Sequence, residues 1–257
     1  MERELLVADS FRTRTNSFTG ETEARGMEMH VSRFIDSVEE AVAGEIPFDD
    51  LAGWLTDFFE SAGEDIAAGG DGFPRFELWR TEEGDLELAC AIRPLPELGE
   101  TLALVTTDRA GERITPWRKG PNIPFYSALN RELGAEALFV DEDGFAIEGA
   151  TTSLVLWNPS TGDGHFLPGA GERRPEGRIV SVTEILVRVI AEEDESSQAI
   201  TEIAVLGSAI TLFEVWAVNA LHGIRVVTSV DGKATQPANE ERLARFRKVL
   251  DQSWQPV

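Results

Sequence analysis

The segment from Ala137 to Trp157 constrains the fold of this chain more than any other part of the sequence. It contains two β-prone apolar runs around Asp143-Gly144, a dipeptide that favours a tight hairpin turn. Glu148 ends the second run, and the hydroxyl residues Thr151 to Ser153 lead into a further apolar run. The pattern therefore predicts a carboxylate at a strand end, among buried strands. Such a group needs a partner, because burying an unpaired charge is costly.

Apolar periodicity elsewhere predicts an α+β chain in two halves that meet near residues 112–120. Ligand clefts commonly form between such halves. A glycine- and proline-rich stretch over residues 158–177 predicts an extended surface loop that borders the site. Helices are expected near residues 30–42, 50–59, 125–133, 182–193 and 237–254. Strands are expected as a pair within residues 5–20, and near residues 75–81, 86–92, 102–107, 203–206, 214–219 and 224–230.

Composition narrows the classes of function. The chain carries 46 acidic against 23 basic residues, a net charge of −23, which repels nucleic acid and anionic membranes. No apolar run is long enough to span a bilayer, and no secretory pattern is present, so we expect a cytoplasmic protein. One cysteine and three scattered histidines predict neither an internal disulfide nor a metal site. Any phosphate-bearing ligand would need local cations and helix N-termini.

Lys119 is one of only three lysines, and it lies in the run Trp117-Arg118-Lys119-Gly120-Pro121-Asn122. A neighbouring cation and partial desolvation favour the unprotonated amine, which is the form that attacks a carbonyl group. Lys233 lies in a predicted turn and Lys248 on the terminal helix, so both are poorly placed for this role. The alternative interpretation is an ordinary solvent-exposed loop lysine.

Taken together, these segments resemble the class IV, or fold-type IV, pyridoxal phosphate (PLP) enzymes. That family includes branched-chain and D-amino-acid aminotransferases and 4-amino-4-deoxychorismate lyase. The resemblance covers roughly residues 7–232. The matching segments follow in the family's order: His30-x-x-Arg33, Lys119 before Gly-Pro-Asn, Glu148-Gly with its hydroxyl residues, the turn Ser181-Val182-Thr183, and Glu214-Val-Trp-Ala-Val-Asn219-Ala220.

The resemblance implies a two-domain α+β fold like that of D-amino-acid aminotransferase. Residues 1–115 would form an N-terminal α+β domain and residues 116–257 a C-terminal α/β pseudo-barrel domain, with PLP in the cleft between them. Lys119 would form the Schiff base with the cofactor and Glu148 would face the pyridine nitrogen. The cofactor phosphate would be bound by Arg33, Ser181, Val182, Thr183, Asn219 and Ala220. Enzymes of this family build the site beside a subunit interface, which implies a homodimer.

Several positions depart from the family pattern. Glu148 follows Lys119 by 29 positions, fewer than usual, and no tyrosine stands just beyond Lys119-Gly-Pro-Asn. Three further residues differ from those that the family commonly has at the matching positions: Ser153, Ala220 and Glu184. We expect an aminotransferase acting on an amino acid and a 2-oxo acid. The alternatives are a 4-amino-4-deoxychorismate lyase, or a non-catalytic, PLP-free relative that serves as a binding or dimerisation module.

Overall fold

The computed structural model describes residues 3–169, 177–193 and 200–257, and the chain divides into two compact units. Unit 1 comprises Met1–Glu97, Arg118–Pro121 and Ser253–Val257, and unit 2 comprises Leu98–Trp117 and Asn122–Gln252. This division differs from the expected domain boundary at residue 115. Leu98–Trp117 packs with unit 2, whereas the four residues that include Lys119 pack with unit 1.

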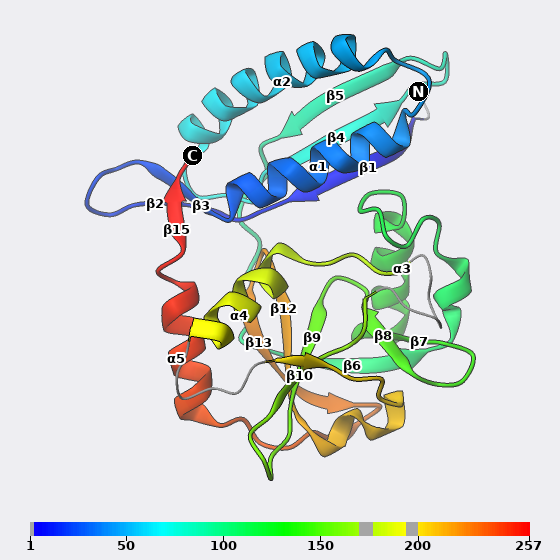
Figure 1. Cartoon of the computed structure of the whole chain (residues 1–257), viewed down its shortest axis with the longest axis vertical. Coiled ribbons are helices and arrows are strands. Elements are labelled where there is room, and N and C mark those ends of the chain that lie inside the picture. The colour runs from blue at the N-terminus through cyan, green and yellow to red at the C-terminus, as the bar shows by residue number, and fades with distance from the viewer. Residues whose placement is uncertain (1–2, 170–176, 194–199) are drawn as a thin grey trace. The chain divides into compact units, whose positions relative to one another are not determined.

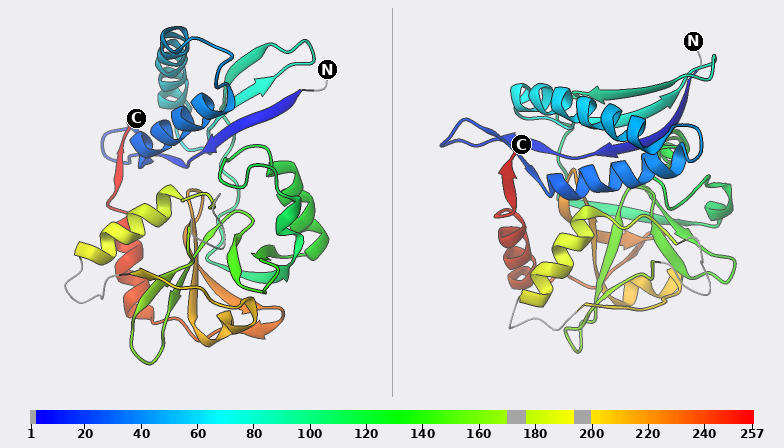
Figure 2. Two further views of the ribbon diagram at one scale, coloured as in Figure 1. Left: turned by 45° about the vertical axis from the view of Figure 1, so that its right-hand side comes forward. Right: turned by 45° about the horizontal axis from the view of Figure 1, so that its top comes forward.

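Unit 1 is built from two antiparallel three-stranded sheets and two helices (Figures 1 and 2). The strand orders are β1-β4-β5 and β15-β3-β2, so β1 is an edge strand. The elements are β1 (Glu4–Ser10), β2 (Thr13–Thr15), β3 (Thr22–Arg25), α1 (Met27–Ala41), α2 (Phe48–Gly69), β4 (Arg75–Arg80), β5 (Leu86–Ala91) and β15 (Trp254–Pro256).

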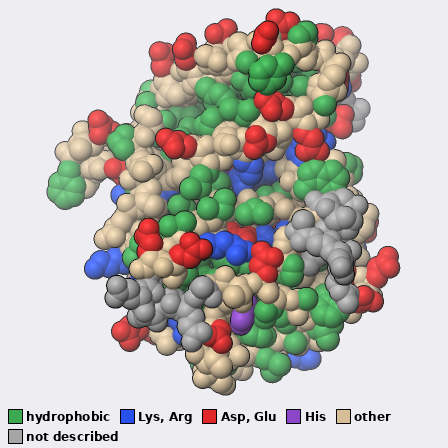
Figure 3. All heavy atoms as spheres, viewed as in Figure 1, with side chains coloured by type: hydrophobic (Ala, Val, Ile, Leu, Met, Phe, Trp, Pro, Cys, Tyr) green, Lys and Arg blue, Asp and Glu red, His purple; other side chains and the backbone are tan. Residues whose placement is uncertain are grey.

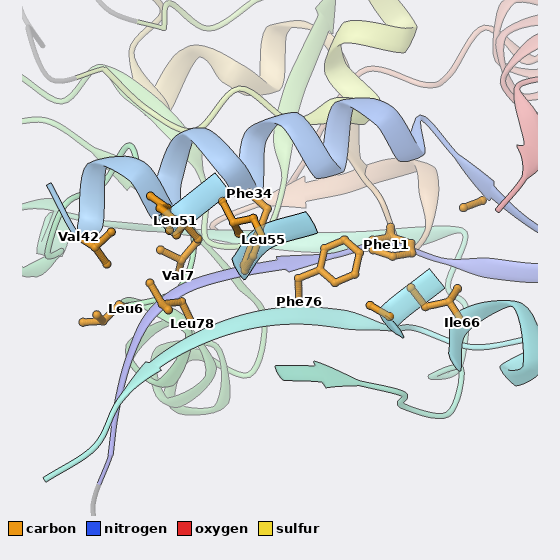
Figure 4. Close-up of a cluster of buried hydrophobic side chains, with 13 residues drawn as sticks. Leu6, Val7, Phe11, Phe34, Val42, Leu51, Leu55, Ile66, Phe76 and Leu78 are labelled. Atoms are coloured by element: carbon orange, nitrogen blue, oxygen red, sulfur yellow. The ribbon is translucent and has the colours of Figure 1, made fainter. Parts of the chain in front are cut away.

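The core of unit 1 lies between the two helices and the β1-β4-β5 sheet. Phe34 of α1 and Leu55 of α2 are buried beside Phe76 and Leu78 of β4, as Figure 4 shows. Burying each such side chain stabilises the fold by roughly 1.5–3 kcal/mol. Both helices carry their apolar residues on one side, so this packing fixes α1 over the sheet and aims the polar residues of its buried face at β1.

Unit 2 contains a nine-stranded mixed sheet in the order β11-β10-β9-β12-β13-β6-β7-β8, with β14 paired to β13. Its strands are β6 (Thr101–Thr107), β7 (Glu136–Val140), β8 (Ala146–Gly149), β9 (Ser153–Trp157), β10 (Gly164–Phe166), β11 (Thr201–Glu202), β12 (Glu214–Asn219), β13 (Gly223–Val230) and β14 (Lys233–Ala234). Its helices are η1 (Arg109–Glu112), α3 (Ile123–Leu133), α4 (Val182–Glu193), η2 (Gly207–Leu212) and α5 (Glu240–Leu250).

The predicted hairpin is confirmed. β7 and β8 pair antiparallel around a turn in which Gly144 adopts φ 83° and its N–H donates to the carbonyl of Asp141 at 2.9 Å. The predicted strand at 203–206 is wrong, because these residues make single backbone bonds to Phe166 and Ala146 rather than a continuous ladder. The terminal helix ends at Leu250, four residues before the predicted end, since Trp254 pairs with β3. Residues 170–176 of the predicted loop lie outside the described residues.

Candidate functional site

Lys119 is held against the free edge of β1 through its own backbone. The N–H of Ala8 donates to the carbonyl of Lys119 at 2.7 Å. The next residue, Gly120, adopts φ +139°, and a Cβ there would lie 2.8 Å from both the Ala8 nitrogen and the Val7 Cα. Only glycine tolerates this approach and this backbone conformation. The Gly that follows the lysine in the sequence motif therefore permits the lysine to dock on the strand.

Asn122, the last residue of the motif, closes the loop that carries Lys119. Its side chain is buried and makes two hydrogen bonds to one residue. The Oδ1 atom accepts from the N–H of Ile114 at 2.7 Å, and Nδ2 donates to the Ile114 carbonyl at 2.6 Å. The Lys-x-x-Asn spacing is thus explained by a loop whose base is pinned within unit 2.

The side chain of Lys119 faces a buried carboxylate that the sequence analysis did not identify as a site residue. Asp9 of β1 is 2% exposed, and its Oδ1 lies 3.8 Å from Lys119 Nζ. It accepts hydrogen bonds from His30 Nδ1 at 2.8 Å and from Arg33 Nε and Nη2 at 2.7 and 2.9 Å. His30 and Arg33 lie one turn apart on the face of α1 that covers β1. The signal for Asp9 was a charged residue inside an apolar strand.

These contacts decide the protonation states in the cluster. Burial alone would raise the pKa of Asp9, but Arg33, Lys119 and His30 hold that pKa well below its usual range. Burial lowers the pKa of His30, against the opposing effect of Asp9, so the imidazole is neutral and donates its Nδ1 proton. Desolvation lowers the pKa of Lys119 to about 8, because Asp9 offsets it only in part and Arg33, Arg93 and Arg75 add to it.

Arg33, the predicted phosphate ligand, is therefore already paired. Two nitrogens of its guanidinium group contact Asp9, and its side chain remains 21% exposed. The structure thus brings Arg33 and Lys119 together through a shared anion. The sequence motifs predict Arg33 and Lys119 separately and do not indicate that both contact Asp9.

Glu148 lies at the end of β8 in unit 2, as predicted, and its partner is Arg113. Arg113 Nη1 donates to Glu148 Oε1 at 2.6 Å, and the two side chains are only 5% and 9% exposed. Arg113 also lies over the ring of Phe139, with 4.8 Å to the ring centroid, and donates from Nε to the Ala110 carbonyl. Burial and the charge of Glu148 raise the pKa of the nearby Tyr126 to about 12. Sequence reasoning missed Arg113, which lies 35 positions from its partner.

Thr151 and Thr152, which follow Glu148 in the sequence, donate hydrogen bonds to a different carboxylate, that of Glu136. Glu136 Oε1 accepts from the N–H of Thr151 at 3.0 Å and from Thr152 Oγ1 at 2.7 Å, and Glu136 Oε2 accepts from Arg225 at 3.2 Å. This network lies directly against Gly149, where a Cβ would be 2.3 Å from Thr152 Oγ1. The Glu-Gly pair and its hydroxyl residues therefore shape the end of the hairpin that presents Glu148.

The predicted phosphate turn forms the start of α4. Ser181 Oγ accepts from the N–H of Glu184 at 3.2 Å, and Val182 and Thr183 are the first two residues of the helix and are buried. Behind this turn, Arg178 and Glu184 form an ion pair at 2.7 Å in which both side chains are 1% exposed. Arg178 also donates to Ser153 Oγ at 3.3 Å, so the α4 start is tied to β9.

The other predicted contacts lie at the end of β12. Asn219 Oδ1 accepts from the N–H of His222 at 2.8 Å, and Asn219 Nδ2 donates to the Thr151 carbonyl at 3.3 Å. Ala220 begins the turn that leads into β13. Unit 2 thus links the ends of β8, β9 and β12, where Glu148, Ser153 and Asn219 lie.

Comparison with solved structures shows the fold. The chain is similar to a branched-chain aminotransferase from the archaeon Thermoproteus uzoniensis (TM-score 0.76, 14% identity, 97% of this chain and 89% of that chain). It is similar to a hypothetical aminotransferase from Mycobacterium tuberculosis in its PLP-bound form (0.71, 17%, 97% and 88%). A protein from Legionella pneumophila, whose proposed activity is that of a 4-amino-4-deoxychorismate lyase, also matches (0.69, 18%, 96% and 90%).

These likenesses confirm the predicted fold class: the chain has the α+β fold of the fold-type IV PLP enzymes. No protein-family model matches the sequence, and no curated protein matches it. Among the described residues, no group of three or more side chains could hold a metal ion, and no helix is long and apolar enough to cross a membrane. Figure 3 shows acidic side chains spread over the face in view.

Proposed function

We propose that this chain is a PLP-dependent aminotransferase that acts on an amino acid and a 2-oxo acid. The observation that carries the proposal is the state of Lys119. Its amine has a pKa of about 8 and is docked on β1 by the glycine of its motif, in a chain with the fold of PLP enzymes. An amine of that pKa is available in both protonation states near neutral pH, as a group that must take and return a proton requires.

The residues present fit the parts of PLP. The Lys119 amine would react with the cofactor aldehyde, and Arg33 supplies a guanidinium group for the phosphate. On unit 2, the first N–H groups of α4, at Val182 and Thr183, and the Asn219-Ala220 backbone are further proposed phosphate donors. Because Arg33 is already paired with Asp9, the phosphate would share this cation with a carboxylate.

Glu148 is proposed to face the pyridine nitrogen. PLP, when bound, would supply an electron sink for the carbanion formed as the amino acid loses its α-proton. Glu148 is buried and would keep the ring nitrogen protonated, and Arg113 holds the carboxylate in place through Oε1. Lys119 Nζ would accept the α-proton from the substrate as a neutral amine and return it as an ammonium group.

A lyase acting on 4-amino-4-deoxychorismate is the second candidate. The Legionella pneumophila structure favours it, as does the Lys119-Gly-Pro-Asn122 run with no tyrosine just beyond it. The proposal also includes a homodimer in the cytoplasm with small-molecule substrates and neither nucleic acid nor membrane as partner. Sedimentation velocity tests the dimer: a single species near twice the mass of the chain supports it.

The test of function combines visible absorbance with turnover. Purified protein incubated with PLP should absorb in the visible range after gel filtration, and should transfer an amino group in a screen of amino donors and 2-oxo acids. Glu148→Gln should retain PLP yet lose turnover by about two to three orders of magnitude, the scale of removing a preorganised charge interaction. The matched control is Glu142→Gln in the exposed β7–β8 turn, which should behave as wild type.

The outcomes separate the candidates. Release of pyruvate from 4-amino-4-deoxychorismate without amino transfer would select the lyase. A folded protein that neither retains PLP nor shows either activity would select the PLP-free binding or dimerisation module. If Glu148→Gln unfolds instead, its pair with Arg113 is structural and its assignment to the ring nitrogen is lost.

A further inference from the structure

The inference concerns Asp9, the buried carboxylate to which the charged groups of unit 1 converge. Three side chains contact it within hydrogen-bond or ion-pair distance: His30, Arg33 and Lys119. Its neighbour in β1, Ala8, donates its N–H to the backbone of Lys119. Two consecutive residues of one edge strand therefore hold Lys119, one through its backbone and the other through its side chain.

We propose that Asp9 is a positioning residue for Lys119: its carboxylate stabilises the ammonium form of the lysine and fixes Arg33 beside it. The catalytic consequence rests on the proposed function, whereas the electrostatic relation stands on the geometry of unit 1. Asp9 does not need to touch a substrate or a cofactor to act in this way.

The charges that face Lys119 show why such a group is needed. Arg33 comes from α1, Arg75 from β4 and Arg93 from the segment after β5, and each of them opposes a positive charge on the lysine, as does burial. Among the described residues, the charge of Asp9 is the leading influence that raises the pKa of Lys119 against them. Without it, burial and the three guanidinium groups would lower the pKa of the amine further, so less of it would be in the ammonium form near neutral pH. A lysine of lower pKa is a weaker base, so its amine would take up a substrate proton less readily.

The remaining contacts keep Asp9 ionised and oriented. Arg33 binds both of its oxygens, through Nε to Oδ2 and Nη2 to Oδ1. Neutral His30 donates to Oδ1, the same oxygen that lies nearest Lys119 Nζ. The two residues of α1 therefore fix the orientation of the Asp9 carboxylate without help from Lys119. The lysine amine lies beside a carboxylate that is already held in place.

The test is a titration of Lys119 in cofactor-free protein. The chain has three lysines, so protein labelled with 13C-lysine gives three Cε signals, and Lys119→Arg identifies the one of interest. In wild type, Lys119 should titrate near its pKa of about 8. In Asp9→Asn its pKa should fall by about one pH unit or more, the scale expected for losing an opposite charge at this distance. Asp85→Asn, in the exposed β4–β5 turn, removes the same formal charge and should leave the titration unchanged.

If Asp9→Asn does not fold, a second variant tests the effect of Asp9 on the pKa of Lys119. Arg33→Gln removes a competing cation and leaves Asp9 to Lys119, so the pKa of Lys119 should rise. The proposal is overturned if wild-type Lys119 titrates near the ordinary lysine value of 10.5, if folded Asp9→Asn leaves its pKa unchanged, or if Arg33→Gln fails to raise it. Because PLP is absent from these samples, failure to bind PLP leaves this assignment standing. An unchanged pKa in Asp9→Asn or Arg33→Gln overturns this assignment and leaves the proposed function standing, whereas a wild-type value near 10.5 would also remove the observation that carries the proposed function.

Discussion

Replacing Gly120 with alanine tests whether docking on β1 prepares Lys119 for reaction. The φ of +139° at Gly120 disfavours any side chain, at a cost of about 1–3 kcal/mol for strained backbone. The added Cβ would meet the Ala8 nitrogen and Val7 Cα at 2.8 Å and Val7 C at 2.9 Å. These neighbours are backbone atoms of a paired strand and yield only by moving it, which costs about 1–3 kcal/mol more.

The expected destabilisation of unit 1 by Gly120→Ala is therefore roughly 2–6 kcal/mol, unless the loop detaches from β1. Detachment would break the Ala8 to Lys119 hydrogen bond, worth about 1 kcal/mol, and carry the amine away from Asp9. Urea unfolding followed by tryptophan fluorescence measures the first outcome. The 13C titration of Lys119 detects the second, because a solvated amine returns toward its ordinary pKa.

The matched control is Gly53→Ala, within α2. A Cβ at Gly53 would meet nothing within 4 Å, so alanine should stabilise the helix by up to about 1 kcal/mol. If Gly120→Ala matches wild type in both unfolding and Lys119 titration, the close approach to β1 is not a feature of the protein in solution, and the account of how Lys119 is positioned fails.

Three further predictions concern stability. Arg178→Met breaks an ion pair whose side chains are 1% exposed and should cost about 3–5 kcal/mol, whereas Arg188→Met, at 27% exposure of the arginine, should cost at most about 1 kcal/mol in urea unfolding. The folded pKa of Asp9 lies below its ordinary 3.8, so its contribution to stability is present above about pH 4 and is lost as the pH falls further; the free energy of unfolding should drop more steeply in acid for wild type than for Asp9→Asn. Gly149→Ala should lower the unfolding midpoint, since its Cβ would lie 2.3 Å from Thr152 Oγ1, and an unchanged midpoint would show that the Glu136 network yields freely.

Local patterns explain how much of the fold could be predicted. The Asp143-Gly144 turn and the helix over 182–193 depend on neighbouring residues, and both occur as expected. Residues 203–206 mislead because Ile203 and Val205 are apolar for packing against the core of unit 2 rather than for pairing in a sheet. Val205 is buried and its carbonyl accepts from Ala146, while Leu206 makes one isolated bridge to Phe145. Apolar content alone does not distinguish these situations.

The residues of the candidate site also fall into those that local sequence predicts and those that only the tertiary structure shows. Arg33, Lys119 and Glu148 follow from motif positions, but the groups that set their charge do not. Asp9 pairs with residues 21 to 24 positions away on α1, and Arg113 pairs with Glu148 across 35 positions. Such pairs are created by tertiary packing, and a single sequence gives no measure of them. For Asp9 the one local signal was a charge within a buried strand.

The measurement that tests the central claim most directly is the location of the PLP attachment. Protein incubated with PLP, reduced with borohydride and digested should carry the pyridoxyl group on Lys119, and Lys119→Arg should carry none. The other two lysines of the chain are internal controls. Lys233 lies in β14 and Lys248 lies on α5. A label on either of these lysines, or no label in folded protein at saturating PLP, would contradict the assignment of Lys119 as the cofactor lysine.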